Sequence, residues 1–195
     1  AMAHKTTVVT RLNEKNYHML ADREMVSVIE GEASFVDDRT VKVVAGDDEL
    51  IVSAPQIFIN TGAESIIPDI PGVDKPFVYT STELLDKMTQ PKQLAIIGGG
   101  YIGLEFASTY TKLGTKVTVF ERGDALLARE DPAIARATTE ALQAQGIEIV
   151  FSVDVTAIEG ESTATIRTVN HDDYAGYDAV LMATGRRPAT MSLNL

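Results

Sequence analysis

The chain has 195 residues, of which 45% are hydrophobic and 23% charged, a composition typical of a globular protein that buries a core. Its formal net charge of −11 would repel a phosphate backbone, which excludes a nucleic-acid partner. The absence of cysteine excludes a disulfide framework, a thiolate nucleophile and a thiolate metal site within these residues. No run approaches the roughly 20 apolar residues of a membrane span, and the start lacks the apolar core of a secretory signal, so we expect a cytoplasmic protein with no membrane partner.

Short β-branched runs precede a proline-rich segment at 66–76. Residues 11–23 are interpreted as the tail of a helix. The runs at 25–35, 39–45 and 49–62 alternate with acidic turn clusters, which predicts an antiparallel meander that ends in a buried strand from Gln56 to Asn60. Because prolines interrupt regular structure, we place the main domain boundary just after the proline-rich segment.

A β-α-β-α-β order follows the boundary and predicts a parallel sheet with right-handed crossovers. Thr80 and Glu83 have the spacing of a capping box, and Asp131 is the expected N-cap of the second crossover helix. Gly114 and Gly146 are expected just past the ends of the two crossover helices. The predicted elements are strand 93–98, helix 101–114, strand 116–121, helix 131–146 and strand 147–151.

The remaining runs at 153–159, 162–169 and 177–185 predict a second meander followed by a central strand. We therefore predict an α/β fold in which residues 80–187 form a Rossmann-like domain, with a parallel sheet and an antiparallel meander. Residues 1–79 would be the β-rich part of a second, similar domain, and residues 188–195 would begin the return to it.

Gly98, Gly100 and Gly103 form a G-x-G-x-x-G motif between a predicted strand and a predicted helix. A bare match is weak evidence, because a tight turn can be purely structural, but here Glu121 also ends the next strand. The three glycines would permit the tight turn, the approach of backbone N–H groups to a pyrophosphate and the close packing of the helix. The motif therefore predicts binding of a nicotinamide dinucleotide.

Glu121 is expected to accept hydrogen bonds from the adenosine ribose, and its charge would repel a 2′-phosphate, which favours NAD over NADP. Arg122 leaves NADP open, because an arginine at this strand end can pair with that phosphate; the alternative is a solvated surface side chain. Tyr101 either covers the nicotinamide or packs on the sheet. Glu105 has apolar neighbours, and because unpaired burial of a carboxylate is costly, it is either exposed or paired outside this chain.

The motifs taken in order resemble the flavin-dependent pyridine nucleotide-disulfide oxidoreductases, the family of lipoamide dehydrogenase, glutathione reductase and mercuric reductase. The resemblance rests on "INTGAESIIPDIPG", "TSTELL", "IIGGGYIGLEFAS", "GTKVTVFE", "REDPAIA" and "LMATGRRPAT". Within the family, "FINTGA" and "GRRPAT" resemble the branch of bacterial hypothiocyanous-acid reductases, whereas most relatives have Asn where Ala189 stands.

This resemblance implies that hydride passes from NAD(P)H to FAD, and then through a redox Cys pair to a disulfide-type or oxidised substrate. The family's FAD motif and Cys pair precede the region matched here, and a dimerisation domain follows it. We therefore expect an excised piece of a homodimeric parent that binds FAD. Residues 1–79 would be part of the FAD-binding domain, and the piece itself would bind NAD(H) without turnover.

The resemblance also implies residue roles. The resemblance implies two catalytic residues. Tyr101 resembles the ring that covers the nicotinamide pocket and swings aside. Glu105 resembles the acid that pairs with a flavin-domain lysine. NADP-dependent relatives hold the phosphate with two basic residues; Arg122 matches one, but Ala128 occupies the other position. The predicted cofactor-binding residues are Gly98, Gly100, Tyr101, Ile102, Gly103, Glu121 and Arg122, with Thr184, Gly185 and Arg186 near the nicotinamide and Ala33, Thr61 and Gly62 on the FAD side.

Two alternatives remain open from the sequence. The chain could be a stand-alone NAD(H)-sensing module, or an enzyme that uses bound NAD directly as an oxidant, which the lack of a convincing base near the glycines disfavours. The three histidines, His4, His18 and His171, lack the spacing of metal ligands, so we expect surface or packing roles for them and predict no metal site.

Overall fold

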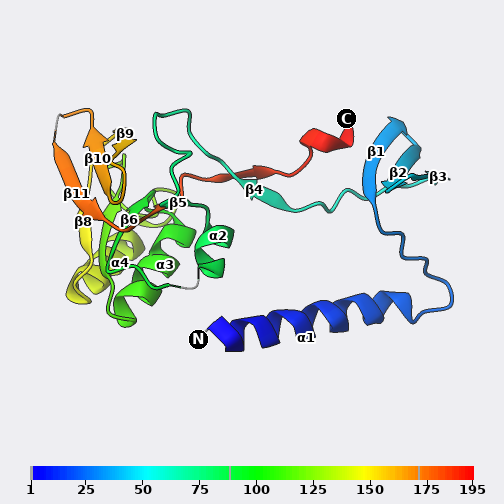
Figure 1. The fold of residues 1–195 in the computed structure, drawn as a ribbon, viewed down its shortest axis with the longest axis horizontal. Coiled ribbons are helices and arrows are strands. Elements are labelled where there is room, and N and C mark those ends of the chain that lie inside the picture. The colour runs from blue at the N-terminus through cyan, green and yellow to red at the C-terminus, as the bar shows by residue number, and fades with distance from the viewer. Residues whose placement is uncertain (1, 88, 171) are drawn as a thin grey trace. The chain divides into compact units, whose positions relative to one another are not determined.

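The computed structural model describes residues 2–87, 89–170 and 172–195, so His171 lies outside the described residues (Figure 1). The chain divides into two compact units. Unit 1 comprises residues 1–63 and 188–195, and unit 2 comprises residues 64–187. The predicted α/β fold class is confirmed, because unit 2 contains both a parallel sheet and an antiparallel meander.

Unit 2 is built on a five-stranded parallel sheet with the strand order β5-β12-β6-β7-β8. The helices α3 (Tyr101–Lys112) and α4 (Pro132–Ala144) are its crossovers, as the β-α-β-α-β pattern predicted. The strands are β5 (Val78–Tyr79), β12 (Ala179–Met182), β6 (Gln93–Ile97), β7 (Lys116–Phe120) and β8 (Glu148–Val150).

The two faces of this sheet are covered by different layers. Leu94 and Ile96 of β6 pack in one hydrophobic cluster with helix residues such as Leu104, whereas Ala95 and Ile97 pack in a second cluster with the meander. Burial on both faces explains why β6 is a continuous apolar run. The meander is antiparallel, with β9 (Val155–Glu159), β10 (Ala164–Thr168) and β11 (Asp173–Tyr177).

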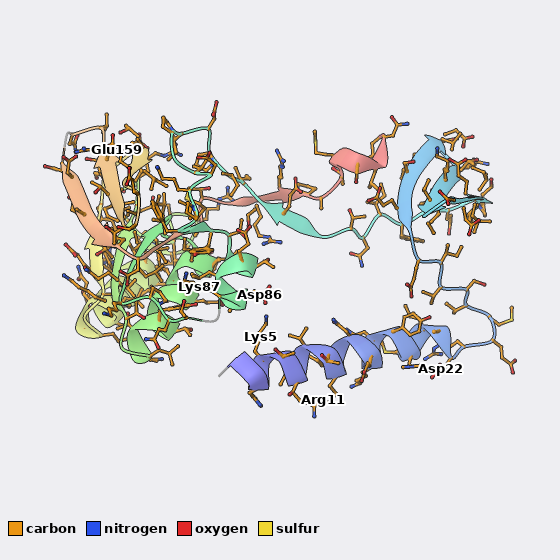
Figure 2. The ribbon with its side chains drawn as sticks, in the orientation of Figure 1. Lys5, Arg11, Asp22, Asp86, Lys87 and Glu159 are labelled. Atoms are coloured by element: carbon orange, nitrogen blue, oxygen red, sulfur yellow. The ribbon has the colours of Figure 1, made fainter. Side chains whose placement is uncertain are left out.

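The predicted helix caps are confirmed. The capping box opens α2 (Ser81–Asp86), with the Thr80 N–H donating to Glu83 Oε2 at 2.7 Å. The other end of α2 is marked in Figure 2 by the labels of Asp86 and Lys87. Lys87 Nζ donates to the Tyr79 hydroxyl at 2.7 Å, which connects the helix end to β5. The N-cap Asp131 begins α4, and Gly114 and Gly146 follow the crossover helices with φ of +94° and +89°.

Residues 64–79 belong to unit 2, whereas the sequence pattern favoured the first domain for them. Phe77 is buried in the second hydrophobic cluster, and its carbonyl accepts the Val180 N–H at 2.8 Å. The Pro71 carbonyl accepts the Ile158 N–H at 2.8 Å. Prolines interrupt regular structure here, but these hydrogen bonds to distant strands fasten the segment to the parallel sheet and its meander.

Unit 1 contains α1 (Met2–Ala21) and a three-stranded antiparallel sheet. The strands of this predicted meander are β1 (Glu32–Asp37), β2 (Thr40–Ala45) and β3 (Asp48–Ser53). A turn of 3-10 helix, η1 (Met191–Leu193), completes the unit, and Asn194 Nδ2 donates to the Phe35 carbonyl at 3.0 Å. The two-stranded sheet of β4 (Ala63–Ser65) and β13 (Arg186–Pro188) contains residues of both units.

The predicted buried strand from Gln56 to Asn60 is wrong, because these residues form no strand and the Phe58 side chain is 86% exposed. A buried strand needs hydrogen-bonding neighbours for its backbone. This segment joins neither the β1-β2-β3 sheet nor the two-stranded sheet of β4 and β13. The β-branched pattern was present, but the neighbouring strands that would bury it were not.

Two adjacent leucines of α2 test which residues form the core of unit 2. Leu84 is fully buried, whereas Leu85 beside it on α2 is 48% exposed. We expect Leu84→Ala to lower the free energy of unfolding by about 2–5 kcal/mol, because it leaves a cavity. Leu85→Ala should cost about 1 kcal/mol or less. Chemical denaturation monitored by circular dichroism would measure both, and equal losses would contradict the assigned core.

Candidate functional site

The glycine turn, residues 98–103, joins β6 to α3 and uses its three motif glycines differently. Gly98 has φ of +112°, and a Cβ there would lie 2.4 Å from the Ala183 carbonyl oxygen. A Cβ on Gly103 would lie 2.2 Å from the Gly98 carbonyl oxygen. A Cβ on Gly100 would meet nothing within 4 Å. Packing therefore requires the first and third glycines, whereas the second faces open space.

The Glu121 carboxylate connects the glycine turn to the loop that follows β7. Its Oε2 accepts the Gly99 N–H at 2.7 Å, and its Oε1 accepts the Gly123 N–H at 2.7 Å. A Cβ on Gly99 would lie 2.8 Å from Glu121 Oε2 and 2.6 Å from Leu126 Cδ2. Gly99 is therefore a fourth constrained glycine, which the sequence analysis missed because it occupies a variable position of the motif.

The loop between β7 and α4 continues this connection. The Leu127 N–H donates to the Gly99 carbonyl at 3.2 Å, and the Glu130 N–H donates to the Leu127 carbonyl at 2.8 Å. Leu126 is fully buried, which holds the middle of the loop against the core of unit 2. These contacts fix the loop backbone beside the start of α3. Leu126, Leu127 and Glu130 carry no motif signal, so the sequence analysis missed their role.

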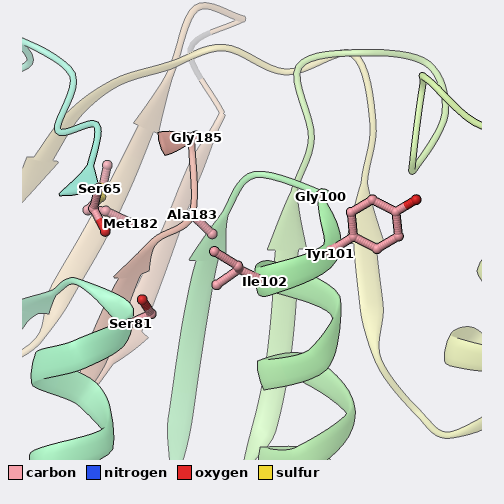
Figure 3. Close-up of a pocket in the computed structure, with 8 residues that line it drawn as sticks. All are labelled: Ser65, Ser81, Gly100, Tyr101, Ile102, Met182, Ala183 and Gly185. Carbon is pink, nitrogen blue, oxygen red and sulfur yellow. The ribbon is translucent and has the colours of Figure 1, made fainter. Parts of the chain in front are cut away.

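A pocket of about 170 Å³ opens on the other side of the glycine turn (Figure 3). It lies between the start of α3 and the segment that follows β12. That segment is held in place because the Thr184 hydroxyl donates to the Ile66 carbonyl at 2.8 Å and the Gly185 carbonyl accepts the Ile66 N–H at 3.0 Å. The pocket is lined by Ser65, Ser81, Gly100, Tyr101, Ile102, Met182, Ala183 and Gly185.

Tyr101 is the first residue of α3, and its side chain is too exposed, at 62%, to be a packing residue of the sheet. Figure 3 shows the ring directed away from Ile102, Ala183 and Gly185, so it leaves the pocket open. The interaction of its hydroxyl with the Glu130 carboxylate raises the pKa of Tyr101 above its ordinary value. The exposure argues against the packing alternative, and the role of Tyr101 at the nicotinamide stays a prediction.

The other predicted residues lie at or beyond the edges of this site. Glu105 is exposed on α3, one of the two possibilities that the sequence left open. Arg122 Nε lies 3.9 Å from Asp154 Oδ1, and its side chain is 81% exposed, so the pair is weak. Arg186 is exposed on β13. Ala33, on β1, and Thr61 and Gly62, which precede β4, belong to unit 1 and are not among the pocket residues.

Membrane spans and metal clusters are both absent from the part of the chain that the structure describes. No helix there combines the length and apolar character needed to cross a membrane. Those same residues hold no group of three or more His, Cys, Asp or Glu side chains that could bind a metal ion.

The parallel sheet, the glycine turn and the acid after the second strand are together typical of a Rossmann-like α/β domain. Residues 2–194 match the family model described as pyridine nucleotide-disulphide oxidoreductase. The chain belongs to this family, as the resemblance of its motifs predicted.

Individual relatives agree with this assignment. The chain is 40% identical over 195 residues to the probable pyridine nucleotide-disulfide oxidoreductase RclA of Escherichia coli K12, and covers 44% of it. It is 36% identical to a mercuric reductase of Staphylococcus aureus, of which it covers 35%. The solved structure of the HOCl-induced flavoprotein disulfide reductase RclA from Escherichia coli, as its Cu(II) complex, is 41% identical and matches 98% of this chain and 44% of that chain, with a TM-score of 0.91. The chain thus spans less than half the length of these relatives.

The different surroundings of the glycines give a matched pair of variants. We expect Gly103→Ala to lower the free energy of unfolding by about 1–3 kcal/mol, because the new methyl group overlaps the Gly98 carbonyl. Gly100→Ala should change it by about 0.5–1 kcal/mol at most, since the methyl group enters open space. Thermal unfolding of the two variants would measure the difference, and a Gly100→Ala variant as unstable as Gly103→Ala would contradict it.

Proposed function

We propose that unit 2 binds NAD(H) and serves as the nicotinamide-nucleotide domain of a longer flavoprotein oxidoreductase. In that parent protein, hydride would pass from NAD(P)H to FAD, and then through a redox Cys pair to a disulfide-type or other oxidised substrate. The observation that carries this proposal is the glycine turn, with its open Gly100 and the Glu121 carboxylate fixed beside it. Family membership supports the flavin chemistry of the parent.

The residues at the turn fit a dinucleotide. Gly100 is the N-cap of α3 and has no side chain to cap the helix, so backbone N–H groups at this positive helix end are available to a pyrophosphate. Each oxygen of Glu121 already accepts one backbone N–H, and a carboxylate oxygen can accept two bonds. The carboxylate can therefore also accept bonds from ribose hydroxyls without releasing the turn.

The strand order gives the bound nucleotide a direction. Glu121 follows β7, the pocket residues Ala183 and Gly185 follow β12, and β6 lies between these strands. If the pyrophosphate binds at the glycine turn, the adenosine half lies on the β7 side. The nicotinamide half then lies on the β12 side, in the pocket.

The pocket can hold a nicotinamide ring. Ile102, Met182 and Ala183 give it apolar walls that can exclude water, and the hydroxyls of Ser65 and Ser81 are available to a carboxamide. When bound, the reduced nicotinamide supplies the hydride. The part of this chain is to bind the nucleotide and orient its ring.

Two observations favour NAD over NADP. The Glu121 carboxylate would repel a 2′-phosphate on the ribose that it binds. Ala128 stands where the resemblance to NADP-dependent relatives places the second basic residue, so that contact to the phosphate is missing. We therefore propose NAD(H) as the preferred nucleotide of this chain.

The surface of unit 1 supports the proposal that it is part of a larger FAD-binding domain. Met25 is 96% exposed and Phe58 is 86% exposed, which is unusual for large apolar side chains. Ala33, Thr61 and Gly62 would be the FAD contacts in that domain, and Glu105 would pair with a lysine from it. We further propose a cytoplasmic, homodimeric parent. A stand-alone NAD(H) sensor has less support, because it leaves this apolar surface unexplained.

Nucleotide preference tests the role of Glu121. We expect Glu121→Gln to weaken NADH binding about fivefold or more, because a hydrogen bond to a charged group is lost. NADPH binding should weaken less, since the repulsion of its 2′-phosphate is also removed. Calorimetric titration would measure the four dissociation constants. Asp124→Asn, which neutralises another carboxylate of the same loop, is the control and should leave the preference unchanged; wild-type chain that binds NADPH more tightly than NADH would contradict the assignment.

A second test asks whether the chain alone can pass electrons from NADH to FAD. We expect the chain to bind NADH but to show no dye reduction when NADH and FAD are supplied together, because the family's FAD motif and Cys pair are not within these residues. A diaphorase assay with a dye acceptor measures this directly. Robust FAD-dependent turnover by the chain alone would contradict the proposal that it is the nucleotide-binding part of a larger enzyme.

A further inference from the structure

A second carboxylate lies beside the strand end that carries Glu121. Asp154 comes shortly after β8, and its Oδ1 lies 3.9 Å from Nε of Arg122, the residue directly after Glu121. The Asp154 side chain is 59% exposed, so its charge is accessible to a nucleotide bound at this edge of the sheet. None of the sequence motifs includes Asp154, and the pair with Arg122 is too exposed to be a strong stabilising contact.

The backbone on both sides of the Asp154 carboxylate is fixed. The Val153 N–H donates to the carbonyl of Glu121 itself at 3.2 Å. The Asp154 carbonyl accepts the Val169 N–H at 2.9 Å, which ties the same segment to the end of β10. Because an aspartate side chain is short, these two hydrogen bonds hold the Asp154 carboxylate near the end of β7.

The charges at this strand end sum to a negative value. Glu121 and Asp154 supply two carboxylates, and Arg122 supplies one guanidinium. A charge in solvent acts over about 8 Å at physiological ionic strength. A phosphate monoester carries a charge of about −2, whereas a ribose 2′-hydroxyl carries none. If the adenosine ribose binds Glu121, a 2′-phosphate would therefore be close to two carboxylates, and the charge of the neighbouring cation would be partly offset.

We propose that Asp154 is a specificity-determining residue that disfavours NADP(H) at this site. Its carboxylate adds to the repulsion that Glu121 exerts on a 2′-phosphate. It also offsets part of the charge of Arg122, the residue of this group that could attract the phosphate. The neutral 2′-hydroxyl of NAD(H) experiences neither effect. This inference rests on the proposed binding of NAD(H) by unit 2.

The test is the ratio of NADPH affinity to NADH affinity. We expect Asp154→Asn to raise NADPH affinity by about two- to fivefold and to change NADH affinity by less than about 1.5-fold, because one negative charge near the phosphate is removed. The substitution retains the shape of the side chain and the backbone bond to Val169. Asp154→Glu keeps the charge and should keep the wild-type ratio. Glu161→Gln, which removes an exposed carboxylate beyond the other end of β9, is the control for net charge and should also keep it.

Calorimetric titration at two salt concentrations separates an effect of charge from an effect of shape. The gain in the Asp154→Asn protein should be present at about 0.1 M salt and largely lost at about 1 M, where a charge acts over only about 3 Å. Thermal unfolding checks that each variant folds.

Four results would overturn the inference. Asp154→Asn could leave the ratio unchanged, which includes NADPH binding that stays below detection in both proteins. Asp154→Glu or Glu161→Gln could raise the ratio as much as Asp154→Asn does, or the gain could persist undiminished at high salt. If wild-type protein binds neither nucleotide, the proposed function itself fails. If it binds NADH and the ratio does not depend on Asp154, only the specificity role fails.

Discussion

The pair of hydrogen bonds that Glu121 accepts from Gly99 and Gly123 is the interaction on which the site depends. A half-buried carboxylate loses hydration, and two backbone N–H donors replace it. These two hydrogen bonds fix the glycine turn against the loop after β7. The Glu121 carboxylate is therefore held at a fixed distance from the start of α3. A side chain at Gly99 would displace the carboxylate, which explains why glycine occupies this variable position of the motif.

The parallel sheet extends this arrangement to the rest of unit 2. Because β6 lies between β7 and β12, a carboxylate and a pocket are held on opposite sides of one glycine turn. Gly98 brings the turn close to the segment after β12, since a Cβ there would overlap the Ala183 carbonyl. The arrangement of the candidate site is therefore a consequence of strand order and close backbone packing.

Local rules account for the features that the sequence predicted correctly. The capping box of Thr80 and Glu83 and the N-cap Asp131 act over a few residues, so their patterns are sufficient. The failures have non-local causes. The segment from Gln56 to Asn60 has a strand pattern but no neighbouring strand, and residues 64–79 are attached to unit 2 through hydrogen bonds to distant strands.

The most direct test of the central claim is amide NMR of the folded chain during titration with NADH. If the backbone at the glycine turn binds the pyrophosphate, the resonances of Gly100, Tyr101 and Ile102 should shift most, together with that of Gly123, while those of β10 in the meander stay in place. Titration to millimolar NADH that leaves the resonances of the glycine turn unchanged, in a protein whose spectrum is otherwise folded, would contradict the account.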